Sequence, residues 1–162
     1  MSPMAKKSNT HELAVWQRKV GAQANNRAWR LSELTTRSPE EDEEMLQAAH
    51  ASNYLWKIVG NACNRAHAAQ VLAHVYALLN SPDAANHYFA QAETFFLERD
   101  CEPWEEACAY AVKANVAAAA GQSEVHASSY REAERRIAAL PHPEERKILN
   151  ATLRVVPKPG EA

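Results

Sequence analysis

One pattern of small and aromatic residues occurs twice in this chain, each time across a predicted pair of helices. The first copy contains Leu72, Ala73, Tyr76, Ala85, Phe89 and Ala92. The second copy contains Ala114, Ala117, Tyr130 and Ala133. Equivalent positions keep a constant offset, which is the same from Ala73 to Ala114 as from Ala92 to Ala133. Self-similarity at a fixed spacing of this size is typical of stacked helix pairs. The repeat therefore constrains the architecture and leaves function to surfaces that the pattern does not specify.

Prolines, glycines and capping residues divide the chain into seven predicted helices. The expected ranges are about 10–35, 39–59, 62–80, 82–99, 103–121, 124–139 and 143–153. The sharpest boundary is at residues 38–41, where Ser38 caps a helix, Pro39 occupies its first turn and Glu41 completes a capping box. The acidic run at residues 40–44 then suits the positive end of the helix dipole, so we interpret it as a helix start and not as a cation site. No segment alternates with a period of two, and short connections make neighbouring helices antiparallel. We therefore expect an all-α fold of stacked antiparallel helix hairpins.

A single domain is expected at residues 10–154, between two flexible ends. Residues 1–9 are polar, and residues 155–162 contain prolines and a glycine that favour fraying. Gly21 weakens the first helix by about 1 kcal/mol relative to alanine. Trp16 fits the apolar stripe of that helix, so it is expected to pack between helices, like the other tryptophans. The alternative is that a tryptophan exposed in a groove marks a protein contact.

Charge and cysteine content exclude several classes of protein. The formal net charge is −2, which provides no basic face for nucleic acid. No apolar run reaches the roughly 18 residues of a membrane span, and residues 1–9 lack the apolar core of a signal peptide. Cys63, Cys101 and Cys108 form neither a disulfide framework nor a CxxC motif. We expect a cytoplasmic protein without a cofactor, since no phosphate-binding loop or hydrolase motif is present either.

The first copy of the repeat resembles the tetratricopeptide repeat, in which small residues let paired helices approach and aromatic residues fill the gaps between pairs. The second copy departs from that pattern, with Lys113, Ala117 and His126 in place of Leu72, Tyr76 and Ala85. The offset between the two copies is also longer than the family's usual repeat length of about 34 residues. The resemblance implies a tetratricopeptide-like domain of two to three helix pairs.

A preceding stretch resembles a group of short bacterial proteins with tetratricopeptide-like helices. The similar segments are residues 39–46, residues 48–56, Val59-Gly60 and Asn64-Arg65-Ala66. With the repeat, the similarity covers roughly residues 10–140. It implies the fold and a bacterial, cytoplasmic setting, and it implies no biochemical activity.

Polar residues gather where the second predicted helix turns into the third. They are His50, Tyr54, Trp56, Asn64, His67 and His74. In an antiparallel hairpin centred near residue 62, positions 50 and 74 lie opposite each other. One interpretation is a ligand or peptide site; the other is a set of hydrogen-bonded core residues that fix the register of the hairpin. No metal site is predicted, because no acidic residue is evidently placed to complete a set of three or four ligands. Cys63 shares a helix face with His67, but a buried, inert thiol is expected there.

We expect a protein- or peptide-binding module whose partner occupies a concave groove lined by alternate helices. The alternative is a small-molecule sensor or enzyme that uses a pocket formed by His50, Tyr54 and His74. A homodimer that buries the groove is a third option. No catalytic residue is assigned.

Overall fold

The structure, a computed structural model, describes residues 3–160, with side chains described from residue 9 onward. Within this range it is all-helical, which confirms the predicted fold class. The helices are α1 (Pro3–Ser32), α2 (Pro39–Val59), α3 (Ala62–Leu78), α4 (Pro82–Phe96), α5 (Pro103–Ala119), α6 (Ser123–Ala139) and α7 (Pro143–Arg154). Each predicted helix is present, and most starts agree within one residue.

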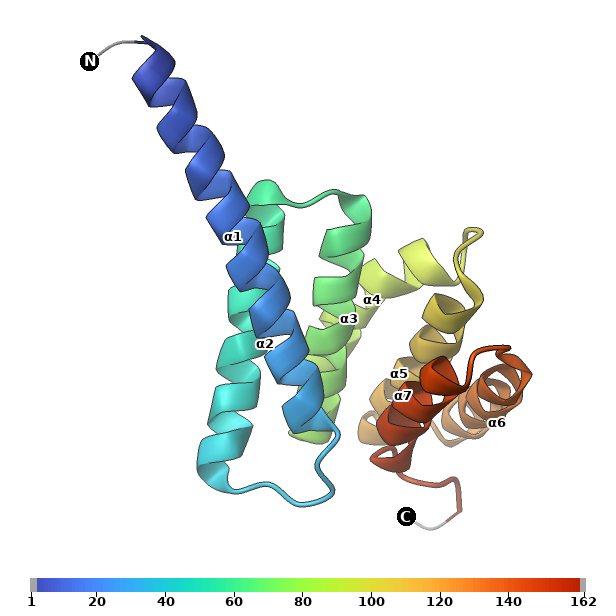
Figure 1. The fold of residues 1–162 in the computed structure, drawn as a ribbon. Helices are drawn as coiled ribbons and strands as arrows, with labels where there is room; N and C mark the ends of the chain where they lie inside the picture. Colours follow the sequence, from blue (N-terminus) through green and yellow to red (C-terminus); the bar gives the residue numbers. More distant parts are fainter. Residues whose placement is uncertain (1–2, 161–162) are drawn as a thin grey trace.

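The helices form three antiparallel hairpins, α1–α2, α3–α4 and α5–α6, and α7 packs on the last of them (Figure 1). Each odd-numbered helix also contacts the next one, so α1, α3, α5 and α7 make a continuous row. The even-numbered helices pack behind this row. The N-terminal half of α1 projects beyond the rest of the molecule (Figure 1).

The repeat is present in the backbone as well as in the sequence. Helices α3 and α5 begin and end at equivalent positions of the two copies. Each is followed by a residue with positive φ, Asn80 at 55° and Gly121 at 68°. The next amide then bonds back into the helix, from Ser81 to the Tyr76 carbonyl and from Gln122 to the Ala117 carbonyl, both at 2.9 Å. A left-handed residue after a helix satisfies the last carbonyls in this way.

Capping side chains hold the starts of α2 and α3. The Ser38 hydroxyl accepts from the Glu41 amide at 3.2 Å, and the Glu41 carboxylate accepts from the Ser38 amide at 2.8 Å. This confirms the predicted capping box. Asn61 and Asn64 make the same reciprocal pair at the start of α3, at 2.9 and 3.1 Å.

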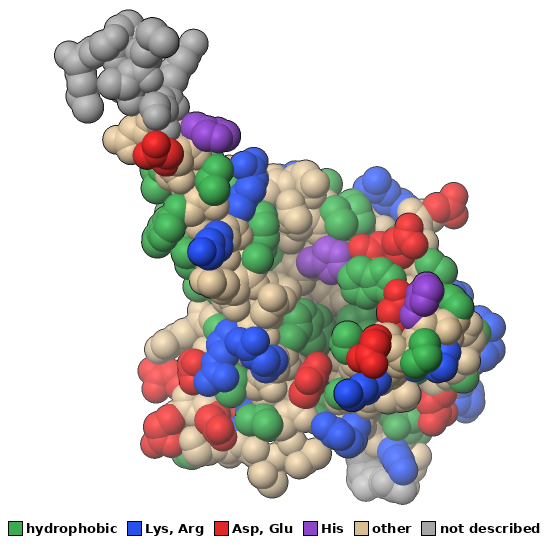
Figure 2. Space-filling model, in the orientation of Figure 1, with side chains coloured by type: hydrophobic (Ala, Val, Ile, Leu, Met, Phe, Trp, Pro, Cys, Tyr) green, Lys and Arg blue, Asp and Glu red, His purple; other side chains and the backbone are tan. Residues whose placement is uncertain are grey.

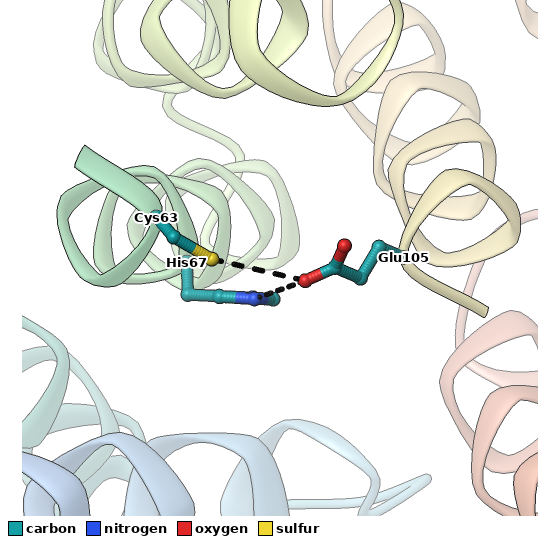
Figure 3. A group of neighbouring side chains, drawn as sticks. All are labelled: Cys63, His67 and Glu105. Atoms are coloured by element: carbon teal, nitrogen blue, oxygen red, sulfur yellow. Dashed lines mark hydrogen bonds and ion pairs between the residues drawn. The ribbon is translucent and has the colours of Figure 1, made fainter. Parts of the chain in front are cut away.

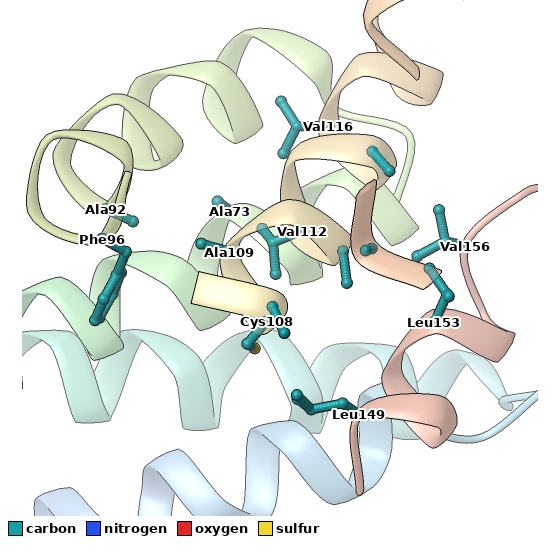
Figure 4. Packing of buried hydrophobic residues seen from close by; sticks show 14 of the residues in the cluster. Ala73, Ala92, Phe96, Cys108, Ala109, Val112, Val116, Leu149, Leu153 and Val156 are labelled. Carbon is teal, nitrogen blue, oxygen red and sulfur yellow. The ribbon is translucent and has the colours of Figure 1, made fainter. Parts of the chain in front are cut away.

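Small buried residues let α3, α4 and α5 approach closely. Ala73, Ala92 and Ala109 are fully buried in the larger of two core clusters (Figure 4). Larger apolar side chains from α4, α5 and α7 fill the remaining space, as protein interiors require. The smaller cluster joins α1, α2 and α3. The two clusters meet at α3, which is therefore the central helix.

At both ends of the chain, the described structure continues beyond the expected domain bounds of residues 10 and 154. Helix α1 begins at Pro3 and not after Asn9. At the other end, Val156 is 3% exposed in the larger core cluster, and the Pro157 carbonyl lies 2.6 Å from His126 Nε2. Val156 extends the apolar face of α7, and burial of that side chain anchors the segment. Residues 1–2 and 161–162 lie outside the described part of the chain.

Helix α1 packs closely against α2 and extends beyond its last residue. Gly21 lies against α2, and an added Cβ would approach Leu55 Cβ and Trp56 Cε2 at 3.3 Å. The glycine thus permits close contact between the helices. Arg18 Nη2 reaches the last residue of α2, with 3.2 Å to the Val59 carbonyl. Trp16 lies beyond this point and is 58% exposed, so the prediction that it packs between helices is wrong.

No helix within residues 3–160 has both the length and the apolar character to cross a membrane.

Candidate functional site

A cleft of about 420 Å³ is bordered by the row of alternate helices α1, α3, α5 and α7. Its lining residues are Asn25, Asn26, Trp29, Glu33, His67, Gln70, Trp104, Cys108, Glu145, Ile148, Leu149 and Thr152. Figure 2 shows the hollow between α1 and the side formed by α5 and α7. A cleft of this size holds a few residues of a peptide or one small molecule.

A second, smaller cleft continues the first toward the ends of α2 and α3. It has a volume of about 240 Å³ and shares Asn25, Asn26, His67 and Trp104 with its neighbour. It adds Ala22, Trp56 and Asn64 to the lining. The two form one groove, with His67 and Trp104 at the junction.

Two side-chain amides in the groove have polar atoms without a protein partner. Gln70 is 1% exposed, and its Nε2 lies 2.9 Å from Cys108 Sγ. Its Oε1 and the Oδ1 of Asn25 are buried and make no hydrogen bond within the described residues. Burial raises the pKa of Cys108 to about 12, so the thiol stays protonated and can pair with either end of the Gln70 amide. In each orientation one end of that amide remains open, which is unusual for a buried polar group.

The main cleft is acidic. Glu33 and Glu145 line it, and its lining includes no lysine or arginine. Burial raises the pKa of Glu33, and the nearby Arg154 opposes that rise. The Arg154 guanidinium also donates to the Glu33 carbonyl at 3.3 Å. A cation bound in this cleft would therefore stabilise the charged form of Glu33, whose carboxylate has lost contact with solvent.

Tryptophan side chains contribute to the lining of the groove. Trp29 stacks on His74 with 5.4 Å between ring centroids. Trp104 lies parallel to His67, with centroids 5.6 Å apart and planes 8° apart. Each tryptophan is only partly buried and lines the cleft, so part of it is accessible to a ligand. Aromatic faces of this kind attract cations and pack against aliphatic chains.

At the junction, Cys63, His67 and Glu105 converge from two helices (Figure 3). His67 Nε2 lies 2.8 Å from Glu105 Oε1, and Cys63 Sγ lies 3.9 Å from the same oxygen. The other carboxylate oxygen, Oε2, accepts from the Glu102 amide at the start of α5. Burial, followed by the charge of Glu105, raises the pKa of the Cys63 thiol.

The structure brings three of the predicted site residues together and leaves three apart. Trp56, Asn64 and His67 line the smaller cleft. His50 instead bonds the Tyr76 hydroxyl through Nε2 at 2.7 Å, and Tyr54 is 65% exposed on α2.

His74 is fully buried and pairs its Nδ1 with Asn115 Nδ2 at 3.0 Å. His74 and the Tyr76 that holds His50 are two positions apart on α3, and so lie on different faces of the helix. His50, Tyr54 and His74 consequently do not share a pocket.

Several residues of the site were not singled out from the sequence, namely Asn25, Asn26 and Gln70 in the groove and Glu105 in the cluster beside it. The repeat carried a usable signal for one of them. Trp104 and Glu105 occupy the positions in the second copy that Cys63 and Asn64 occupy in the first, so stacking of the repeats places the first turns of α3 and α5 side by side. The amides of α1 lie outside the repeat, and the sequence has no comparable signal for them.

Comparison with models of protein families, with curated proteins and with solved structures found no match.

Proposed function

We propose that this protein is a peptide-binding module, and that its groove between α1, α3, α5 and α7 holds a segment carrying a lysine or arginine side chain. The supporting observation is the pair of buried amides, Asn25 and Gln70, whose open ends face no protein partner. A peptide group offers both an N–H and a C=O, so it can satisfy an amide in either orientation. When a ligand supplies the missing hydrogen-bond partner of a buried polar group, the free-energy cost of the unpaired group is removed and binding is favoured.

The charges and rings of the cleft supply the preference for a basic side chain. Glu33 and Glu145 attract a cation, and the exposed parts of Trp29 and Trp104 can contact it. An acidic peptide would meet these two carboxylates; the nearby Arg154 offsets part of the charge of Glu33 but does not line the cleft. The proposal keeps the cytoplasmic setting expected from the sequence, in agreement with three cysteines that are all free thiols.

The test is selection from a random-sequence peptide display library, followed by NMR of the tryptophan indole N–H signals. Selected peptides are expected to be enriched in lysine or arginine and to shift Trp29 and Trp104. Trp16 is an internal control, because it is exposed on α1 and absent from the cleft lining. Enrichment of acidic peptides, or shifts confined to Trp16, would contradict the proposal.

Two variants make the test specific to the groove. Gln70→Leu keeps the side-chain volume near that of glutamine and removes the amide, so affinity should fall about tenfold. Tyr54→Ala removes an aromatic ring from the exposed face of α2, outside the cleft, and should leave affinity unchanged. Equal affinity of the Gln70→Leu variant and the wild type would remove the amide from the binding site.

A further inference from the structure

The side chains of Cys63, His67 and Glu105 bring three different metal-binding atoms together at the junction of the groove. Sγ, Nε2 and a carboxylate oxygen all lie within 4.8 Å of one another. Cys63 and His67 are four positions apart on α3 and therefore share one face of the helix. Glu105 completes the group from the first turn of α5 (Figure 3). We propose that these three residues bind a zinc ion, with the fourth coordination position open to solvent.

The distances are close to those that zinc requires. Tetrahedral bonds of about 2.3 Å to sulfur and about 2.0–2.2 Å to nitrogen and oxygen put neighbouring donor atoms about 3.3–3.6 Å apart. The observed separations from Glu105 Oε1 are 2.8 Å to His67 Nε2 and 3.9 Å to Cys63 Sγ. All three donor atoms lie within 4.8 Å of one another, so side-chain rotations that move them by up to about 1 Å would bring them onto one ion.

Neighbouring contacts already hold two of the three donors in place. The ring of His67 contacts two aromatic rings: Trp104 is stacked on it at 5.6 Å, and the centroid of Phe96 is 4.8 Å away. Glu105 Oε2 is held by the Glu102 amide at 3.1 Å, which directs Oε1 toward α3. Such contacts fix ligand orientation and raise metal affinity.

The donor set selects the metal. A thiolate, an imidazole and a carboxylate suit zinc, whereas calcium and magnesium prefer oxygen ligands throughout. On binding, zinc takes the place of two protons: the Cys63 thiol proton passes to solvent, and the proton that His67 Nε2 donates to Glu105 leaves that nitrogen, so that the neutral ring carries its proton on Nδ1. The cluster thus changes from a hydrogen-bonded group to a coordinated one. His67 lines both clefts, which gives the ion a path from solvent.

Calorimetric titration with zinc chloride and absorption spectra with cobalt test the site, with the full chain reduced and freed of metal beforehand. One zinc per chain is expected, and cobalt should show a thiolate charge-transfer band. Cys63→Ser and Glu105→Gln should each weaken binding about 100-fold, and Cys63→Ser should abolish the band. Circular dichroism identifies any variant that fails to fold, and Cys63→Ser is the conservative change that remains informative if Glu105→Gln does fail.

A matched thiol variant separates this site from adventitious binding. Cys101→Ser also removes one thiol, outside the cluster, and should retain both the affinity and the band. Unchanged affinity in Cys63→Ser, or a cobalt spectrum without a thiolate band in the wild type, would overturn the proposal. No peptide is present in these titrations, so their outcome is independent of the proposed peptide binding.

Discussion

At the scale of single residues, His74 shows how burial makes a histidine sensitive to acid. The side chain is fully buried and stacks on Trp29. Burial, assisted by the positive charge of Arg37, lowers the pKa of His74 to about 3. The unfolded chain binds a proton near pH 6.5, so between about pH 6.5 and pH 3 it holds one proton that the folded protein does not. As the pH is lowered through this window, the free energy of unfolding should therefore decrease, by up to about 1.4 kcal/mol per pH unit from this residue. Urea unfolding at pH 7 and pH 4.5 measures the decline.

The variant His74→Phe isolates the contribution of this histidine from that of the carboxylates. Phenylalanine keeps an aromatic ring against Trp29, and Asn115 Nδ2 can still donate to the carbonyl of residue 74, which lies 3.2 Å away. Between pH 7 and pH 4.5 the variant should lose about 2 kcal/mol less stability than the wild type. Equal declines in the two proteins would mean that His74 does not titrate in this way.

Two tryptophans of α1 are expected to differ sharply in their contribution to stability. Trp29 packs against both core clusters and stacks on His74, so Trp29→Ala should lower the free energy of unfolding by about 3 kcal/mol. Trp16 is 58% exposed, and Trp16→Ala should change it by less than about 0.5 kcal/mol. Chemical denaturation of both variants makes the comparison. A large loss for Trp16→Ala would show that the exposed stripe of α1 is covered in solution.

At the scale of elements, two serines that precede helices allow a matched test of capping. Ser38 accepts a hydrogen bond from the Glu41 amide, whereas Ser81 makes no side-chain cap bond at the start of α4. Ser38→Ala should therefore cost about 1 kcal/mol of stability and Ser81→Ala close to none. Thermal or urea unfolding of the two variants measures the difference. Equal costs would show that the hydrogen bond of Ser38 contributes little to holding α2.

Helix starts could be predicted from the sequence because capping depends on residues within one turn. Pro39, Pro82, Pro103 and Pro143 each stand in the first turn of a helix that was expected there. Helix ends were less accurate, since α4 stops at Phe96 and not near residue 99. No glycine or proline marks that end, and the chain turns where Phe96 enters the core and the Cys101 thiol contacts its carbonyl at 3.2 Å.

The contacts between helices that form the site could not be predicted from the sequence. His67 meets Glu105, and His74 meets Asn115, across the interface of α3 and α5. Asn115 occupies the position in the second repeat that His74 occupies in the first, so the two bond because stacked repeats bring equivalent positions together. The prediction that His50 faces His74 assumed instead that the contacts of these residues follow from the antiparallel pairing of α2 and α3. In the structure, the stacking of odd-numbered helices decides which residues line the groove.

At the scale of the whole molecule, the groove depends on α7, which closes the row of odd-numbered helices. Glu145, Ile148, Leu149 and Thr152 provide this side of the cleft. Helix α7 is held by its apolar face against α5 and α6, and by the segment that follows it. The last residues of the domain are thus expected to affect the groove from a distance.

Truncation of the C-terminal segment tests this dependence. A chain that ends at Arg154 loses the buried Val156. It also loses the Pro157 carbonyl, so Nε2 of the buried His126 is left without this partner. Loss of one buried valine and one buried hydrogen bond should lower the free energy of unfolding by about 2–3 kcal/mol. A chain that ends at Lys158 keeps both contacts and should match the full chain. Urea unfolding ranks the three proteins, and the Trp104 indole signal reports whether the cleft changes with α7. If the two shortened chains are equally stable, Val156 and Pro157 do not anchor α7, and the groove is held by α5 and α6 alone.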